Sequence, residues 1–307
     1  MADLNVSIGN LELENPVMVA SGTFGYAGEF RDFMELKSLG AIVTKTITLE
    51  SRQGNLPPRT CETPSGMLNS IGLENPGIEG FIRDKLPELI RIGPPVIVSI
   101  SSENDPKEFV ELARKLEKIK GVAALELNIS CPNIKSARRN ARLISQDPAA
   151  AFAVVKSVRK ATRKTIITKL SPNVTDIAEI AKACEDAGTD AVSLVNTFYG
   201  MSINIRSGRP RLGSVSGGLS GPAIRPIAVR MVWEAYQKIK IPIIGMGGIM
   251  NSADAIEFFL AGASAISVGT ANFINPAASI EVLEGIKKYL NRNKVKGIKD
   301  LTGSIKI

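Results

Sequence analysis

The densest group of chemically active side chains lies near the middle of the chain, where residues 125–133 read LELNISCPN. An apolar run at the start of this segment predicts a buried strand, and Asn128, Cys131 and Asn133 lie at or just beyond its end. Pro132 has no N–H to donate, so strand pairing stops there. A thiol at the carboxyl end of a parallel strand, flanked by amides, is a common arrangement in barrel active sites. A buried cysteine beside turn-forming asparagines has the same pattern, so the other strand ends must decide.

Two lysines also stand at the ends of predicted strands. Lys45 lies in the sequence TKT, and Lys169 lies in the sequence TKL. Burying a lysine is costly unless an anionic group meets it, although a single side chain can extend to water. Two lysines on different strands therefore favour a functional site. A polar pair, Asn196 and Thr197, follows another predicted strand, and we expect it at the same end of the sheet as the two lysines.

Glycines follow the last two predicted strands, in GMGG at 245–248 and in SVGT at 267–270. Backbone N–H groups at glycines can approach an anion closely, and the loops after the last two strands are the usual phosphate site of a barrel. Tight turns that need small residues are the alternative. We favour phosphate, because the two segments follow neighbouring strands. The first segment is not a dinucleotide fingerprint, since it lacks the Gly-x-Gly-x-x-Gly spacing.

Two further segments suit a flat polar ligand. Residues 20–23 read ASGT and are small enough to admit a planar group against the backbone. Residues 69–73, in a long predicted loop, read NSIGL and offer an amide and backbone groups for hydrogen bonding.

Composition excludes several kinds of site. The chain has no histidine, which removes Ser-His and Cys-His pairs and imidazole metal sites, so we expect no metal. Acid–base chemistry is left to Cys, Lys, Tyr, Asp or Glu. The three cysteines, Cys61, Cys131 and Cys184, are odd in number and far apart, which favours the reducing cytoplasm over a disulfide framework.

The formal net charge is +8, with basic clusters at 138–142 and 206–211 and in the last twenty or so residues. Aromatic residues make up 5% of the chain and do not interleave with these clusters, so nucleic-acid binding by base stacking is poorly supported. A solvated basic surface is the leading interpretation, and an anionic substrate or a protein partner comes second. The chain contains no run of 18 apolar residues, so we expect no membrane span, and the first residues lack signal-peptide features.

Short apolar strands and amphipathic helices alternate from residue 17 onward. Few charges lie inside the strands, which is typical of a parallel sheet covered by helices. Eight such units in one domain, 1–307, predict an α/β fold of the (β/α)8 TIM barrel type. The expected strands are 17–20, 41–46, 96–100, 123–129, 165–170, 191–195, 243–245 and 265–268. The expected helices are 29–38, 78–91, 106–119, 148–161, 176–187, 223–240, 253–261 and 276–290.

Three features extend this barrel. Residues 4–8 and 11–14 predict an N-terminal β-hairpin around the turn dipeptide Gly9-Asn10. Long loops follow strands 2 and 6, at 48–77 and 198–221, and loops of this length usually serve as lids or binding walls. Residues 291–307 are expected to form a basic C-terminal extension that contributes to neither core nor site.

With these residues assembled, the chain resembles the dihydroorotate dehydrogenases, FMN enzymes of pyrimidine (UMP) biosynthesis. The segment NISCPN at 128–133 is similar to the one that carries the catalytic base of class 1 enzymes, whereas class 2 enzymes have serine there. The segments GGLSGPAI at 217–224 and IIGMGGI at 243–249 resemble the B type of class 1. The likeness runs from the N-terminal hairpin through the last strand. One departure is the segment at 136–145, where the family usually has a glycine-rich stretch and an aromatic residue.

The resemblance implies two sets of binding residues. Those expected to contact one FMN are Ser21, Lys45, Thr46, Ser99, Asn128, Lys169, Val195, Gly221, Gly247, Gly248, Gly269 and Thr270. Those expected to hold dihydroorotate or orotate are Lys45, Asn69, Ser70, Ile71, Gly72, Leu73, Asn128, Asn133, Asn196 and Thr197.

The resemblance also implies a mechanism and partners. The catalytic residues are expected to be Cys131, Lys45 and Lys169: the Cys131 thiolate takes the C5 proton of (S)-dihydroorotate while C6 delivers hydride to FMN N5, and Lys169 stabilises charge at the flavin edge. Electrons are expected to reach NAD through a partner subunit that carries FAD and a [2Fe-2S] cluster, because three scattered cysteines cannot hold a cluster. A homodimer joined by this electron-transfer subunit gives a heterotetramer. A dihydropyrimidine dehydrogenase-like flavoenzyme and a non-catalytic flavin-binding scaffold remain the alternatives.

Overall fold

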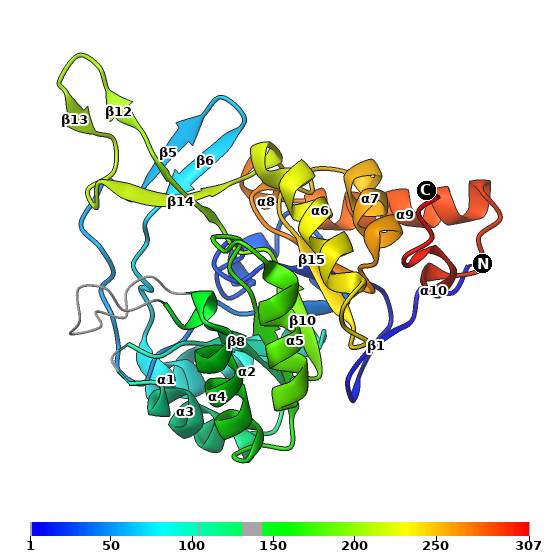
Figure 1. The fold of residues 1–307 in the computed structure, drawn as a ribbon, viewed down its shortest axis with the longest axis horizontal. Helices are drawn as coiled ribbons and strands as arrows, with labels where there is room; N and C mark the ends of the chain where they lie inside the picture. Colours follow the sequence, from blue (N-terminus) through cyan, green and yellow to red (C-terminus); the bar gives the residue numbers. More distant parts are fainter. Residues whose placement is uncertain (1, 104, 131–142, 307) are drawn as a thin grey trace.

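The computed structural model describes residues 2–103, 105–130 and 143–306 of the 307-residue chain. Its centre is a closed barrel of parallel strands in the order β10-β15-β16-β3-β4-β7-β8-β9 (Figure 1). The barrel strands are β3 (Val17–Val19), β4 (Ala41–Val43), β7 (Val96–Ile100), β8 (Val122–Asn128), β9 (Thr165–Lys169), β10 (Ala191–Leu194), β15 (Ile243–Met246) and β16 (Ala265–Val268). The predicted (β/α)8 TIM barrel is confirmed.

Helices follow the strands and surround the barrel (Figure 1). They are α1 (Gly77–Gly80), which continues through a π-helical turn (Phe81–Lys85) into α2 (Leu86–Ile92), then α3 (Lys107–Glu117), α4 (Pro148–Arg159), α5 (Ile177–Ala187), α6 (Arg225–Tyr236), α7 (Ser252–Ala261), α8 (Ala271–Ile274), α9 (Ala278–Arg292) and α10 (Ile298–Leu301). Three of them have N-terminal side-chain caps: Asp147, Asp176 and Asn251 accept hydrogen bonds from first-turn backbone N–H groups of α4, α5 and α7.

The first predicted helix, at 29–38, is wrong. The segment contains only two short 3-10 turns, Gly28–Phe30 and Leu36–Ser38. The Phe24 ring stacks on the Phe30 ring with centroids 3.9 Å apart, and Phe33 between the turns is 60% exposed. An isolated helix of about ten residues is only marginally stable, so the backbone conformation of residues 29–38 is set by packing of the first turn against the core.

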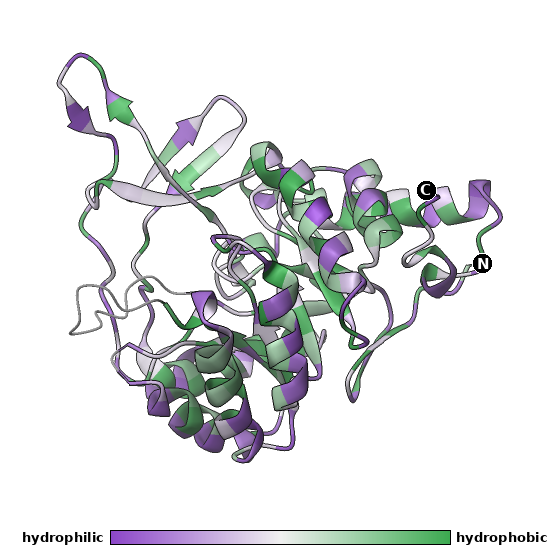
Figure 2. Ribbon diagram, viewed as in Figure 1, coloured by the Kyte–Doolittle hydropathy of each residue, from purple (hydrophilic) through white to green (hydrophobic). Residues whose placement is uncertain are grey.

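The core lies between the barrel and its helices. All eight strands are almost wholly buried, and hydrophobic residues line them, while the helices carry hydrophilic residues along part of their surface (Figure 2). The predicted N-terminal hairpin is confirmed as β1 (Val6–Ile8) paired antiparallel with β2 (Leu11–Leu13). The N–H of Asn10 donates to the hydroxyl of Thr165, the first residue of β9, at 3.2 Å, so the hairpin lies at the amino ends of the strands. The opposite ends are left for ligands.

The two long loops are not structureless. They contribute β5 (Thr60–Thr63), β6 (Gly66–Asn69), β11 (Phe198–Met201) and β14 (Ser216–Ser220), which form one antiparallel sheet in the order β11-β14-β6-β5. A smaller hairpin of β12 (Ile203–Asn204) and β13 (Arg209–Pro210) extends beyond it (Figure 1). The sequence predicted long functional loops but not that they pair with each other.

The prediction that residues 291–307 add nothing to the core is wrong. In α10, Ile298 and Leu301 are 1% and 3% exposed and belong to the main hydrophobic core. The N–H of Asp3 donates to the carbonyl of Lys296 at 2.8 Å, so the first described residues lie beside the segment that leads into α10 (Figure 1). Apolar residues spaced among the lysines therefore anchor this segment. Across the described ranges, no helix combines the length and the apolar character that a membrane crossing requires.

Candidate active site

A cavity of about 510 Å³ opens at the carboxyl ends of the barrel strands, between them and the sheet built by the long loops. Because these ends carry the active site in barrel enzymes, its lining identifies the candidate site. Predicted site residues that line it are Ser21, Lys45, Thr46, Asn69, Ser70, Ile71, Gly72, Leu73, Asn128, Lys169, Asn196 and Thr197. The sequence prediction missed other lining residues, among them Asn55, Met67, Asn173, Tyr199, Ser220 and Phe273.

A hydrogen-bonded network of hydroxyl and amide groups connects the strand ends. The Thr46 hydroxyl lies 3.2 Å from that of Ser21 and 3.0 Å from that of Ser99, and it accepts from the Asn128 amide at 3.2 Å. The Asn196 amide donates to the Asn128 side-chain oxygen at 3.5 Å. Ser99 is fully buried behind Thr46, so it supports the cavity wall and does not form it. Such a network holds its members in one orientation, because each buried polar group depends on its neighbour.

The two predicted lysines differ in their surroundings. Lys169, with a side chain only 6% exposed, has its Nζ atom 4.0 Å from a carboxylate oxygen of Glu126, which is 2% exposed. This carboxylate offsets part of the cost of burying a lysine. Lys45 forms no salt bridge within the described part of the chain, so its charge is available to a ligand. Both lysines line the cavity and make it suitable for an anion.

The predicted loop segment 69–73 is held by hydrogen bonds from other loop residues. The Asn69 amide donates to the Gly218 carbonyl at 3.2 Å, and the Asn55 amide donates to the Ser70 carbonyl at 3.1 Å. The Ser70 hydroxyl is buried and has no hydrogen-bond partner among the described residues, although it lines the cavity. A buried hydroxyl without a partner is rare, so it is a natural contact for a polar ligand.

Asn173 fixes the position of the predicted pair Asn196 and Thr197. Its amide donates to the Thr197 carbonyl at 3.0 Å, and its side-chain oxygen accepts from the Tyr199 N–H at 2.9 Å. The Thr197 N–H donates to the Asn196 side-chain oxygen at 2.9 Å. The signal for Asn173 was available in the sequence, since it follows the strand that carries Lys169 by four positions.

The predicted phosphate residues Gly221, Gly248, Gly269 and Thr270 do not line this cavity; they lie beside it, next to its residue Ser220. The Thr270 hydroxyl donates to the hydroxyl of the cavity residue Ser220 at 2.8 Å. Gly248 has φ +81°, and a Cβ there would lie 2.9 Å from the Gly221 carbonyl oxygen. The N–H groups of Gly248, Gly269 and Thr270 donate no backbone hydrogen bond to other described residues. Free N–H groups of closely packed glycines are suited to a phosphate.

Gly247 adjoins Val195, since a Cβ on Gly247 would come within 3.2 Å of a Val195 methyl carbon; we call Gly221, Gly247, Gly248, Gly269 and Thr270 together the glycine cradle. Val195 is 3% exposed. Neither residue lines the cavity at the strand ends.

Cys131 and Asn133 lie outside the described residues. Their neighbour Ser130 lines the cavity and donates its hydroxyl to the Lys169 carbonyl at 3.1 Å. Of the other cysteines, Cys61 and Cys184 are free. Burial raises the pKa of the Cys184 thiol to about 12, so it remains protonated and unreactive. Within the described ranges, no cluster of His, Cys, Asp and Glu could hold a metal ion.

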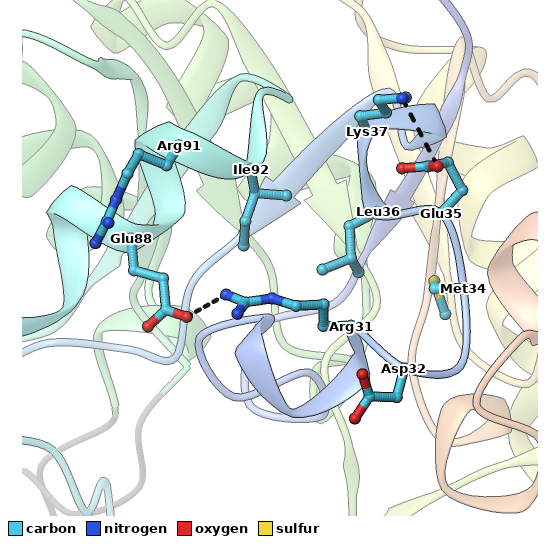
Figure 3. A pocket seen from close by; sticks show the side chains of 9 residues that line it. All are labelled: Arg31, Asp32, Met34, Glu35, Leu36, Lys37, Glu88, Arg91 and Ile92. Atoms are coloured by element: carbon cyan, nitrogen blue, oxygen red, sulfur yellow. Dashed lines mark hydrogen bonds and ion pairs between the residues drawn. The ribbon is translucent and has the colours of Figure 1, made fainter.

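A larger hollow of about 710 Å³ lies elsewhere, against the segment 31–37 and the helix α2. Charged side chains dominate its lining and pair with one another: Arg31 with Glu88 at 2.5 Å, and Lys37 with Glu35 at 3.7 Å (Figure 3). It contains none of the predicted site residues. Four of its charged side chains are paired with one another and it holds none of the polar residues at the strand ends, so the smaller cavity is the better candidate.

Comparison with known proteins finds relatives of this chain over nearly its whole length. The family model described as dihydroorotate dehydrogenase matches residues 3–290. The catalytic subunit of dihydroorotate dehydrogenase B (NAD(+)) from Geotalea uraniireducens is 51% identical over 303 residues, covering 99% of this chain and 98% of that protein. The subunit of the same name from Pelobacter propionicus is 51% identical over 303 residues, with coverage of 99% and 98%. That from Geotalea daltonii is 52% identical over 305 residues, with coverage of 99% for both chains.

Proposed function

The chain belongs to the dihydroorotate dehydrogenase family and, within it, to the class 1 B type, and from this premise we propose that it oxidises (S)-dihydroorotate to orotate with FMN as its cofactor. The observation that carries the proposal is the cavity at the carboxyl ends of the strands. It joins two lysines with an amide and hydroxyl network, and the phosphate glycines lie beside it, next to Ser220.

The residues present fit FMN. The closely packed glycines with free N–H groups would hold the phosphate, and the polar network with Lys169 would meet the polar edge of the ring. The groups that would contact or support FMN are Ser21, Lys45, Thr46, Ser99, Asn128, Lys169, Val195, Gly221, Gly247, Gly248, Gly269 and Thr270. When bound, FMN supplies the acceptor for the hydride that the substrate gives up.

The chain's own residues would bind the substrate and move its proton. Dihydroorotate combines amide edges with a carboxylate. The side-chain amides of Asn128 and Asn196 offer both donors and acceptors, and Lys45 has a charge that no described carboxylate neutralises. We assign Asn69 to Leu73, Asn133 and Thr197 to the same substrate. Cys131, the residue after the cavity-lining Ser130, would take the C5 proton as a general base.

Electrons would leave through a separate subunit. A cluster relay needs about four cysteine thiolates, and the chain has 3 cysteines in all. We therefore propose that a partner carrying FAD and a [2Fe-2S] cluster passes electrons to NAD, and that two copies of each subunit form a heterotetramer. The free state of Cys61 and Cys184 supports a cytoplasmic location.

The acceptor provides a direct test. The isolated chain should reduce an artificial dye with dihydroorotate but should not reduce NAD, and addition of the electron-transfer subunit should restore NAD reduction. Steady NAD reduction by the chain alone, or fast turnover with fumarate, would contradict this assignment. Dihydrouracil serves as the comparison substrate, because it lacks the carboxylate that Lys45 is proposed to meet.

A further inference from the structure

A buried carboxylate, Glu126, lies in the barrel interior close to the cavity, although the sequence did not suggest it. It is on β8, and its side-chain oxygen accepts a hydrogen bond at 3.1 Å from the hydroxyl of Ser193 on β10. β9 lies between these two strands in the barrel order, so a direct contact between them must cross the interior. Glu126 is thus an acidic group inside an otherwise mostly apolar barrel.

The surroundings of Glu126 satisfy it only in part. One carboxylate oxygen has the Ser193 hydroxyl, and the other has no hydrogen-bond partner among the described residues. That second oxygen lies 4.0 Å from the Lys169 ammonium nitrogen, which is near enough for an ion pair but too far for a hydrogen bond. Lys169 lines the cavity and Glu126 does not, so the cation faces the cavity and the carboxylate lies behind it.

Stability alone does not explain such a pair. A buried ion pair often contributes nothing over apolar residues of the same volume, because both charges lose their hydration. A loose pair with one unpartnered oxygen is a poor stabiliser in particular. A role in ligand binding explains the pair better, because the Lys169 ammonium faces the cavity.

We propose that Glu126 is a positioning residue for Lys169: its negative charge holds the ammonium at the cavity and offsets part of its charge. This limits how strongly the site favours a negatively charged ligand over a neutral one. The inference rests on the proposed function in one respect, namely that the ligand beside Lys169 is FMN. Reduced FMN carries more negative charge than oxidised FMN, so the pair sets the balance between the two.

The test compares four full-length proteins: wild type, Glu126→Gln, Lys169→Met and the double variant. For each, the dissociation constants of oxidised and reduced FMN are measured by anaerobic titration. Glu126→Gln should raise the ratio of the oxidised to the reduced constant about tenfold or more, because the Lys169 charge is no longer offset. Lys169→Met should lower this ratio by a similar factor. The double variant should lie within about threefold of wild type, because both charges are gone.

Two controls accompany the series. Ser193→Ala removes the hydrogen bond to Glu126 but keeps both charges, so the ratio should change by less than about threefold. Glu126→Asp keeps the charge and should restore most of the wild-type ratio. A ratio in Glu126→Gln that stays at the wild-type value or falls would overturn the proposal.

Urea unfolding of the four flavin-free proteins separates this proposal from the function assigned above. Each single variant should be less stable than the double variant, since each leaves one buried charge alone. If the wild-type protein binds no FMN, the function proposed above is wrong. The unfolding free energies of the four proteins then test by themselves whether Glu126 and Lys169 are coupled. Single-variant effects that simply add in the double variant would then show that Glu126 and Lys169 are not coupled.

Discussion

Replacement of Gly248 by alanine tests the assignment of the phosphate cradle. Gly248 has φ +81°, and an added Cβ would lie 2.7 Å from the Arg225 Cβ and 2.9 Å from the Gly221 carbonyl oxygen. The left-handed backbone costs about 1–2 kcal/mol for a residue with a side chain, and overpacking costs about 1–3 kcal/mol more. We therefore expect a loss of about 2–5 kcal/mol in the free energy of unfolding, measured by urea titration.

The same change should weaken FMN binding. Movement of the Gly221 or Gly248 backbone would remove the N–H contacts proposed for the phosphate, and each such charge-assisted bond contributes about 1.5–3 kcal/mol. We expect the dissociation constant of FMN to rise at least about tenfold, measured by quenching of flavin fluorescence.

Gly93→Ala is the matched control. Gly93 also has a positive φ, +113°, but the nearest atom to its added Cβ is the Lys37 Cβ at 3.9 Å, and Gly93 does not line the cavity. It should lose stability and keep its FMN affinity. Wild-type FMN affinity in Gly248→Ala, or an equal loss of affinity in Gly93→Ala, would refute the assignment of the cradle.

Three further predictions concern the thiols and the polar network. Cys131→Ala should bind orotate but lose about two to four orders of magnitude in the rate of flavin reduction, measured by stopped flow, whereas an inactive Cys184→Ala would show that the wrong thiol had been assigned. Because burial raises the pKa of Cys184 from 9.0 to about 12, the folded state keeps a proton that the unfolded state releases, so urea-measured stability should fall between about pH 9 and 12. Cys184→Ala should flatten this slope, and an unchanged slope would count against the cause. Thr46→Val should lose about 1–3 kcal/mol of unfolding free energy, because Ser21, Ser99 and Asn128 lose their shared partner. Thr63→Val, at the half-exposed end of β5, is the control, and an equally small loss in Thr46→Val would contradict the network.

Much of the fold followed from local patterns. The repeated alternation of short apolar runs and helical periodicity predicted the barrel. The polar residues that follow the strands line one cavity at the carboxyl end of the barrel. Lys45, Lys169, Asn128 and Asn196 were accessible to this reasoning because a strand end is a local feature.

What sequence reasoning missed depends on long-range contacts. The pairing of β6 with β14 joins residues about 150 positions apart and has no local signature. Glu126 lies within the predicted strand 123–129 with no local feature that marks it, and only the barrel closure places it beside Lys169 and Ser193. The failed helix at 29–38 and the buried Ile298 and Leu301 have the same cause, since packing against distant elements overrides the local pattern.

The most direct test of the proposed function is an anaerobic titration of the FMN-loaded chain with (S)-dihydroorotate. The oxidised flavin absorbance should bleach and one orotate should form for each flavin reduced, and Lys45→Met should require far more substrate for the same bleaching. Flavin that stays oxidised with dihydroorotate, or that bleaches equally well with dihydrouracil, would contradict it.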